Sequence, residues 1–141
     1  MSSSDAPAEE PCVFCRIVAH DSPAYTVYED AATMAFLDLF PFTRGHLLVV
    51  PKHHGARLTD LPVGSQNALI RTLDRMCRRA EHLTSDYNVA LNAGAAAGQI
   101  IFHVHFHIIP RYGEANPFHP SVRTRLSESE ARAVVAELSV S

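Results

Sequence analysis

Three histidines, His103, His105 and His107, alternate with apolar residues in the segment 101–109. In a β-strand, successive side chains point to opposite faces, so a strand here would place all three imidazoles on one face. Imidazoles two residues apart would have Cα atoms about 7 Å apart, close enough to surround one phosphate or one metal ion. The opposite face would pack into the core through four apolar side chains: Phe102, Val104, Phe106 and Ile108.

Imidazole suits phosphoryl chemistry because it is a nucleophile when neutral and a hydrogen-bond donor when protonated, with an ordinary pKa of about 6.5. We expect a neutral His105, the middle residue, to attack phosphorus and form a covalent nucleotidyl-imidazole. A neighbouring protonated histidine or a backbone amide would stabilise the developing negative charge. Two alternatives stay open at this point: the histidines could be zinc ligands, or they could form a hydrogen-bonded polar face.

Cys12 and Cys15 form a Cys-x-x-Cys pair near the N-terminus. Two thiolates at this spacing can bind one tetrahedral zinc ion from a tight turn, so the pair is half of a zinc site. The alternatives are two small buried apolar residues or a redox-active pair. With Cys77 the chain has three cysteines, which suit a reducing compartment better than a disulfide scaffold and predict a cytoplasmic location.

The composition is that of one folded unit. A chain of 141 residues with 47% hydrophobic residues fits a single domain, which we place at residues 11–141. Residues 1–10 are polar and acidic, and we expect them to form a disordered tail rather than a signal peptide. The net charge of -3 and the scattered basic residues argue against nucleic-acid binding, and no apolar stretch is long enough to span a membrane.

The hydrophobic pattern predicts an α+β fold with a mostly antiparallel sheet. Apolar segments of strand length, bounded by turn residues, occur at 24–29, 34–39, 46–50, 87–91 and 100–109. A glycine-containing loop at 94–98 joins the last two of them.

Two helices are expected among these strands. The longer covers residues 60–83, and Ser127 with Glu130 forms a capping box ahead of a short C-terminal helix. The apolar stripe of the long helix is predicted to contain Leu69, Ile70, Leu73, Met76, Cys77, Ala80 and Leu83.

The residues 103–109 read His-Val-His-Phe-His-Ile-Ile, which resembles the signature of the histidine-triad (HIT) family, and Pro110-Arg111 is similar to its continuation. Further matches occur in the family's order: Cys12-x-x-Cys15, Phe36-x-Asp38, Gly45-His46-x-x-Val49-x-Pro51-Lys52, and Asn92-x-Gly94 with Gly98-Gln99. The resemblance spans roughly residues 12–111 and implies a HIT-like fold.

The resemblance also implies a nucleotide site around His105 and His107. His105 corresponds to the family's nucleophile, which becomes nucleotidylated and is freed by water, and His107 corresponds to the histidine that contacts the phosphate. Asn92, Gly98 and Gln99 correspond to the loop that approaches the α-phosphate. Glycine lets backbone amides come close to an anion, and amide side chains can hydrogen-bond to it.

The nucleoside part of the site is implied in the same way. Asp38 corresponds to the acidic residue that accepts hydrogen bonds from the ribose hydroxyls, with Phe36 and Leu39 lining an apolar base pocket. His46 would have a supporting hydrogen-bonding role. Ile100 departs from the family, because many members have Ser or Thr directly after the Gly-Gln pair; it has no hydroxyl to donate to the phosphate, so the leaving-group preference stays open.

Many bacterial HIT proteins that resemble this chain hold a structural zinc at the Cys-x-x-Cys position. The resemblance implies His54 and His103 as the two ligands that complete the site with Cys12 and Cys15, with His53 as an alternative to its neighbour. A closed four-ligand site is structural rather than catalytic, so we expect no catalytic cofactor. The resemblance further implies a homodimer in which strands of two subunits form a larger sheet.

These expectations describe a cytoplasmic hydrolase or nucleotidyl transferase. It would cleave at the α-phosphate of a nucleoside phosphoramidate or a dinucleoside polyphosphate, with a purine as the expected base, through a covalent intermediate on His105. The alternative is a non-catalytic nucleotide-sensing or metal-binding module that acts in a protein complex.

Overall fold

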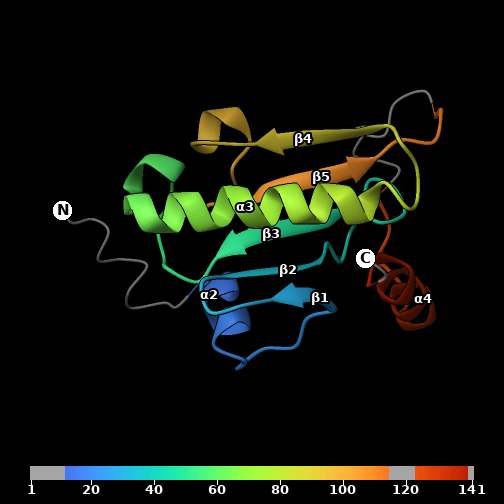
Figure 1. Cartoon of the computed structure of the whole chain (residues 1–141), viewed down its shortest axis with the longest axis horizontal. Helices are drawn as coiled ribbons and strands as arrows, with labels where there is room; N and C mark the ends of the chain where they lie inside the picture. Colours follow the sequence, from blue (N-terminus) through green and yellow to red (C-terminus); the bar gives the residue numbers. More distant parts are fainter. Residues whose placement is uncertain (1–11, 115–122, 140–141) are drawn as a thin grey trace.

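The computed structural model describes residues 12–114 and 123–139, so the tail predicted at residues 1–10 lies outside the described part. A five-stranded sheet with the order β1-β2-β3-β5-β4 forms the middle of the molecule (Figure 1). All neighbouring strands are antiparallel. The strands are β1 (Thr26–Glu29), β2 (Thr33–Leu37), β3 (Leu47–Pro51), β4 (Tyr87–Leu91) and β5 (Phe106–Pro110). The predicted α+β class and antiparallel sheet are confirmed.

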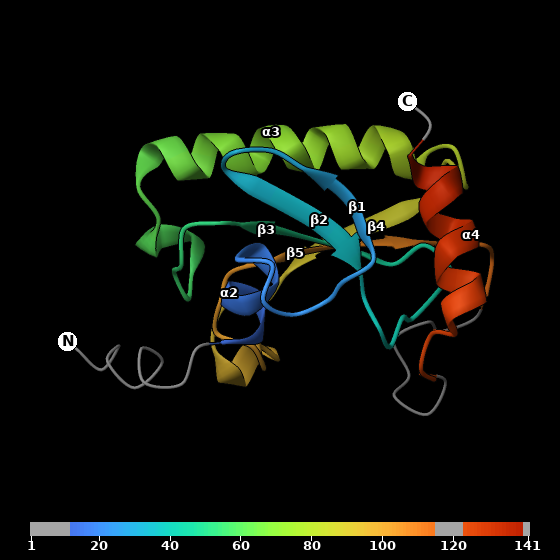
Figure 2. The same cartoon turned by 90° about the horizontal axis from the view of Figure 1, so that it is seen from below.

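Helices cover both faces of this sheet. The long helix α3 (Val63–Ala80) lies across one face, α2 (Val13–Val18) lies on the opposite face, and α4 (Glu128–Leu138) closes one end of the molecule (Figure 2). Single turns of 3₁₀ helix, η1 (Leu58–Asp60) and η2 (Ala95–Ala97), occur in the connections. Among the described residues, none of the helices combines the length and apolar character that a membrane crossing requires.

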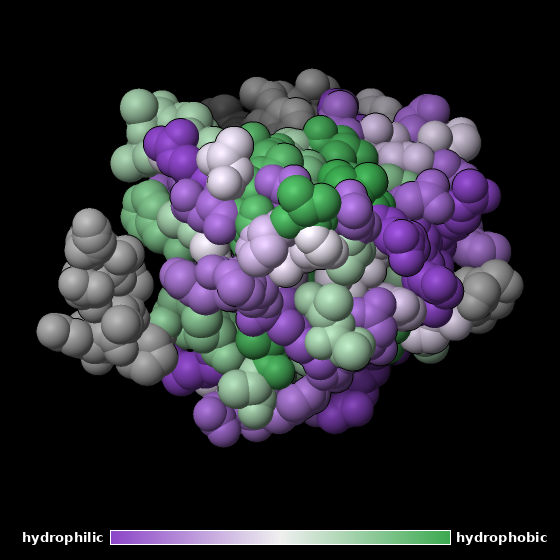
Figure 3. Space-filling view, turned by 60° about the vertical axis from the view of Figure 1, so that its left-hand side comes forward, coloured by the Kyte–Doolittle hydropathy of each residue, from purple (hydrophilic) through white to green (hydrophobic). Residues whose placement is uncertain are grey.

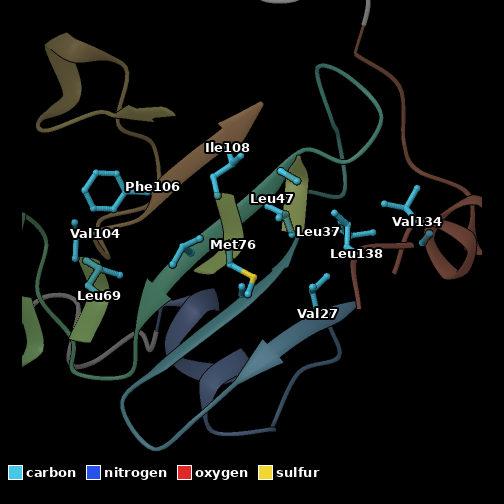
Figure 4. Close-up of a cluster of buried hydrophobic side chains, with 14 of the residues drawn as sticks. Val27, Leu37, Leu47, Leu69, Met76, Val104, Phe106, Ile108, Val134 and Leu138 are labelled. Atoms are coloured by element: carbon cyan, nitrogen blue, oxygen red, sulfur yellow. The ribbon is translucent and has the colours of Figure 1, made fainter. Parts of the chain in front are cut away.

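The central strands are buried on both faces, and their side chains alternate between two hydrophobic clusters. The cluster on the α3 side (Figure 4) includes Ala35, Leu37, Leu47, Val49, Leu69 and Met76. The cluster on the α2 side contains Phe14, Ile17, Met34, Phe36, Leu48 and Val50. The sheet therefore separates a core layer under α3 from a second apolar layer under α2.

The stripe predicted for α3 is correct except at its edge. Leu69, Met76 and Ala80 are fully buried, but Ile70 is 48% exposed and Thr72 is buried instead. The hydroxyls of Thr72 and Thr33 hydrogen-bond at 2.6 Å, which satisfies the buried polar group. The helix begins at Val63 rather than at residue 60. Proline disfavours a helical backbone in the residue before it, and Leu61, which precedes Pro62, is extended.

The predicted strand at 100–109 is only half a strand. β5 begins at Phe106, and residues 101–105 lie outside the ladder. The backbone N–H of Val104 instead donates to the carbonyl of Gly55 at 2.8 Å. As a result Phe102 is 44% exposed, whereas Val104 is buried with the core as expected. Of the three histidines, only His107 is held by the sheet.

The sequence predicts the C-terminal helix α4 but not the N-terminal helix α2. The Cys-x-x-Cys segment, expected to be a turn, opens the six-residue helix α2: Cys12 is the N-cap and its sulfur accepts a hydrogen bond from the N–H of Cys15 at 3.1 Å. The C-terminal helix α4 is confirmed, with Ser127 as N-cap accepting from the N–H of Glu130. Its buried face consists of Ala131, Val134 and Leu138.

Candidate functional site

A cavity of about 830 Å³ opens on the side of the sheet opposite α3, beside α2. Its apolar walls come from α2 and β2, and its polar groups come from the end of β2, the end of β4, the histidine segment and the stretch that leads to α4. The residues predicted from the sequence that line it are Phe36, Asp38, Leu39, Asn92, Gly98, His105 and His107. Segments far apart in the sequence are thus brought to one cavity.

His105 is held in one tautomer by the backbone of its own segment. Its Nδ1 lies 2.8 Å from the carbonyl oxygen of His103. A carbonyl can only accept a hydrogen bond, so Nδ1 carries the proton and Nε2 keeps its lone pair. The ring is 8% exposed and lines the cavity. A neutral imidazole with an available Nε2 is therefore presented to a ligand.

His107 is held in the opposite tautomer by a chain of hydrogen bonds. The N–H of Phe42 donates to Nδ1 of His46 at 3.1 Å, so the proton of neutral His46 is on Nε2. This Nε2–H donates to Nδ1 of His107 at 2.9 Å, which leaves the proton of neutral His107 on its Nε2. Because β3 and β5 are antiparallel with Leu48 opposite His107, His46 lies on the same side of the sheet.

Burial keeps these imidazoles neutral. Desolvation, together with positive charge on His107 and Arg123, lowers the pKa of His46 to about 2. Desolvation, with a contribution from His105, lowers the pKa of His107 to about 4. The pKa of His105 is lowered by burial, but the carbonyl of His103 and the charge of Asp38 oppose the shift. Asp38 thus favours a positive charge on His105.

Asp38 directly follows β2, and its two carboxylate oxygens have different partners. Its Oδ1 accepts a hydrogen bond from the N–H of Phe40 at 2.8 Å, as in a strand-end turn. Its Oδ2 lies 3.6 Å from Nε2 of His46 and 3.4 Å from the guanidinium of Arg123. Burial raises the pKa of this carboxyl, whereas the Phe40 N–H and Arg123 lower it.

The loop after β4 places Asn92 and Gly98 in the cavity but not Gln99. Gly98 has a φ of +97°, a backbone conformation that side chains rarely adopt. The Gln99 side chain instead braces the loop: its Oε1 accepts from the N–H of Gly94 at 2.7 Å, and its Nε2 donates to the carbonyl of Ala56 at 2.7 Å. Ile100 lines the cavity and is 84% exposed, with no polar group to offer a leaving group.

A second cluster joins α2 to the histidine segment: Cys12, Cys15, His54 and His103. The sulfur to nitrogen distances are 3.1–3.8 Å, and the two Nδ1 atoms are 3.2 Å apart. A tetrahedral zinc with bonds of about 2.3 Å to sulfur and about 2.0–2.1 Å to nitrogen would separate its ligands by about 3.3–3.8 Å. The cluster therefore fits a closed tetrahedral metal site.

His103 is oriented for this role by β3. Its Nε2 lies 2.8 Å from the carbonyl oxygen of Pro51, so Nε2 carries the proton and Nδ1 keeps the lone pair directed at the two cysteines. The cluster includes His54 and not its neighbour His53. All three cysteines are free thiols rather than disulfides.

Phe14 and Arg123 are two of the cavity residues that are not among the predicted site residues. Phe14, between the two cysteines, packs edge-on against the ring of His105 with centroids 5.0 Å apart. The signal for it is the spacing of three residues between Phe14 and Ile17, which places both on the buried face of α2. Arg123 enters the cavity from the stretch before α4, and its sequence neighbourhood contains no signal for such a role.

Comparison with known proteins identifies close relatives. Residues 19–114 match the family described as HIT domain. An uncharacterised HIT-like protein of Mycobacterium tuberculosis is 46% identical over 102 residues, 71% of each chain. The adenosine 5'-monophosphoramidase HNT1 of Candida albicans is 37% identical over 110 residues, 74% of this chain and 72% of the yeast protein.

A solved structure extends the similarity to nearly the whole chain. The crystal structure of a Zn-bound histidine triad family protein from Mycobacterium smegmatis superposes with a TM-score of 0.75 at 39% identity. The match covers 91% of this chain and 93% of that one. The sheet and the helices thus belong to a known architecture.

Proposed function

The chain belongs to the histidine-triad (HIT) family of enzymes, and on this premise we propose that it hydrolyses nucleotides at the α-phosphate through a covalent intermediate on His105. The observation that carries the proposal is the pair of opposite tautomers in one cavity. His105 offers a lone pair on Nε2, and His107 offers a proton on Nε2. A nucleophile and a proton donor side by side are what displacement at phosphorus requires.

In the first step, Nε2 of His105 forms a bond to the α-phosphorus, and the bond from phosphorus to the leaving group breaks. The leaving group takes the electron pair and a proton from solvent, while Nε2–H of His107 donates a hydrogen bond to it. The modified imidazole becomes positively charged, and the carbonyl of His103 and the carboxylate of Asp38 stabilise this charge. The negative charge on the phosphate oxygens would be stabilised by Asn92 and the backbone of the loop at Gly98.

In the second step, water attacks the phosphorus and the bond to His105 breaks. The electron pair returns to Nε2, the proton of the water is released, and the nucleoside monophosphate leaves. Because both imidazoles end neutral, the cycle can restart without a cofactor in the chemistry.

The cavity walls support a nucleoside on the other side of the phosphate. Asp38 would accept hydrogen bonds from the ribose hydroxyls, and Phe14, Phe36 and Leu39 would enclose the base, which we take to be a purine. The Candida relative is named as a phosphoramidase that acts on an adenosine monophosphate derivative. An adenosine phosphoramidate is therefore the first substrate to try, and a dinucleoside polyphosphate the second.

The cluster of Cys12, Cys15, His54 and His103 would hold a structural zinc ion. Its donor set leaves no open position, so the metal would supply folding energy rather than a reactive water. It would tie α2, and with it Phe14, to the segment that carries His105. The Zn-bound relative from Mycobacterium smegmatis supports the choice of metal.

We also propose that the protein is a cytoplasmic homodimer. β4 is an edge strand of the sheet, and Val89, opposite Ile108, points to the α3 side, where it is 44% exposed. Ile70 of α3 is exposed on the same side. Figure 3 shows hydrophobic residues gathered in patches on one face of the molecule. A second copy that continues the sheet at β4 would cover Val89 and Ile70.

Intact-mass spectrometry tests the proposed function. The protein is mixed with adenosine 5'-phosphoramidate and quenched without acid, because phosphorus–nitrogen bonds are acid-labile. We expect an adenylyl adduct on the wild type and on His82→Ala, a surface control, and none on His105→Ala. If the wild type forms neither adduct nor product with the phosphoramidate or with diadenosine polyphosphate, yet binds adenosine monophosphate, the non-catalytic nucleotide-sensing alternative replaces the hydrolase.

A further inference from the structure

We propose that Arg123 is a positioning residue for Asp38, and that through it the protein selects nucleotides with an intact ribose diol over deoxyribose nucleotides. The inference rests on the proposed function, because it assumes a nucleotide in the cavity. It adds a residue from outside the region that matches the HIT domain, which ends at residue 114.

Three contacts fix the guanidinium of Arg123 at the rim of the cavity. Its Nε donates to the carbonyl of Phe40 at 2.7 Å, and its central carbon lies 4.1 Å from the ring centroid of Phe42. One terminal nitrogen lies 3.4 Å from Oδ2 of Asp38. The side chain is 31% exposed, so water only partly screens its charge from the carboxylate.

Asp38 needs such a partner because of where it lies. Its side chain is 14% exposed, and burial favours the protonated form of a carboxyl group. A protonated carboxyl has lost one acceptor, and Oδ1 is already used by the N–H of Phe40. Oδ2 must therefore be ionised to accept hydrogen bonds from a diol. The positive charge of Arg123 next to Oδ2 favours that form and fixes the direction of its lone pairs.

The segment that follows Arg123 is anchored to the protein at two points. The N–H of Leu126 donates to the carbonyl of Leu39 at 2.8 Å, so the chain returns to the residue that follows Asp38. Farther on, Glu137 of α4 forms an ion pair with Arg44 at 2.6 Å. Arg123 thus arrives at Asp38 as part of an ordered element rather than as a free surface side chain.

Arg125 provides a matched control. It has the same charge, lies two residues away and stacks on the ring of Phe40 at 5.7 Å, but it is not among the residues that line the cavity. Replacing either arginine by alanine changes the net charge equally. Only Arg123→Ala removes the contact to Asp38.

The test is calorimetric binding of adenosine monophosphate and its 2',3'-dideoxy analogue to the full chain. We expect the wild type and Arg125→Ala to prefer the ribonucleotide by about tenfold or more, as for hydrogen bonds to a charged acceptor. Arg123→Ala should reduce this preference to less than about threefold, because it weakens the binding of the ribonucleotide and leaves that of the dideoxy analogue unchanged. Arg123→Lys keeps the positive charge but not the planar guanidinium with its fixed donors, so it should keep part of the ribose preference that Arg123→Ala loses.

The outcomes separate this inference from the proposed function. If Arg123→Ala and Arg123→Lys keep the full ribose preference, or weaken both nucleotides equally, the positioning role is wrong although the nucleotide site stands. If the wild type binds neither nucleotide, the proposed function itself fails. A double-mutant cycle with Asp38→Asn should be non-additive, because the two residues act on the same hydroxyls.

Discussion

The histidines of the site illustrate how a side chain acquires a role from the atoms around it. His103, His105 and His107 are identical groups in a regular pattern, yet each has a different nitrogen engaged by the protein. The Pro51 carbonyl directs the free nitrogen of His103 to the cysteines, and the His103 carbonyl frees Nε2 of His105. One pattern therefore yields three imidazoles with different free nitrogens, which match the proposed roles of ligand, nucleophile and donor.

The pH dependence of stability should report the neutral state of His107. Its pKa is about 4 in the folded protein against 6.5 for an unburied histidine, so the unfolded chain binds more protons between these values. The contribution of His107 to the free energy of unfolding is therefore fully present above about pH 6.5. It is lost as the pH is lowered toward 4, and the loss is on the order of 3 kcal/mol. Urea unfolding at a series of pH values measures the slope.

Two single variants make this expectation specific. His107→Gln should reduce the slope of the free energy of unfolding against pH, below pH 6.5, by nearly the equivalent of one bound proton. His82→Gln, at an exposed position of the chain, should leave this slope unchanged. Equal slopes in His107→Gln and the wild type would contradict a buried neutral His107.

The loop after β4 shows what an element must supply for an anion site. Gly98 adopts a φ of +97°, and a Cβ there would lie 3.4 Å from Nδ2 of Asn92. Gln99 then locks the loop to the carbonyl of Ala56 through its amide. The backbone of this loop is therefore fixed before a ligand arrives, which would lower the entropic cost of binding a phosphate there.

Replacing Gly98 by alanine should cost about 1 kcal/mol of stability and weaken nucleotide binding, because the backbone there suits glycine. Gly64→Ala in the first turn of α3 is the control: no heavy atom lies within 4 Å of its Cβ position, and alanine favours a helix. We expect Gly64→Ala to leave binding unchanged and stability equal or higher, as measured by thermal unfolding and calorimetry. A Gly98→Ala protein with normal affinity would show that the loop geometry is not needed.

The short helix α2 is an element that the proposed zinc ion would support. With six residues it is too short to be stable by itself, and Phe14 and Ile17 pack it against the sheet. A metal ion bound to Cys12, Cys15, His54 and His103 would add to this anchoring. Because Phe14 touches His105 and lines the cavity, loosening α2 should affect nucleotide binding as well as stability.

Metal removal should therefore have two effects. We expect one zinc ion per chain by elemental analysis, and we expect a chelator or Cys15→Ser to lower the Tm by at least about 5 °C and to weaken nucleotide affinity. His53→Ala, beside the cluster but outside it, should keep the metal and the Tm. If the purified protein contains no metal and a chelator leaves its Tm unchanged, Cys12 and Cys15 are simply two buried thiols.

At the scale of the whole molecule, β4 is one of the two edge strands of the sheet. The strand order places β4 at an edge, with Val89 exposed there and Ile70 exposed on the helix above the same face. An exposed edge with apolar side chains is a surface that proteins usually cover. A symmetric dimer would bury it and extend the sheet through two subunits.

Val89→Glu should convert the dimer into a monomer, because it places a charge in the proposed interface. Val63→Glu is the matched control: it also replaces an exposed valine, 70% exposed, but at the start of α3, where a negative charge is favourable. Light scattering coupled to gel filtration measures the mass of each. If the wild type is already a monomer at micromolar concentration, the interface does not exist.

Local pattern in the sequence was enough to predict the fold class, the helix α4, the strands β1 to β4 to within a few residues, and the types of residue at the site. Hydrophobic periodicity reports which side chains share a face, and this holds wherever an element is regular. It failed at residues 101–105, where the backbone of Val104 bonds to Gly55 rather than to a neighbouring strand, and at Ile70, on the edge of the helical stripe.

The tertiary structure alone decided which partner each functional group has. The link between His46 and His107 follows from the register of β3 and β5, His54 rather than His53 reaches the cysteines, and Arg123 meets Asp38 across 85 positions of sequence. Such contacts depend on how distant segments pack, and no local periodicity encodes them. The sequence therefore determined the available chemistry, and the packing assigned each tautomer, ligand and charge its place.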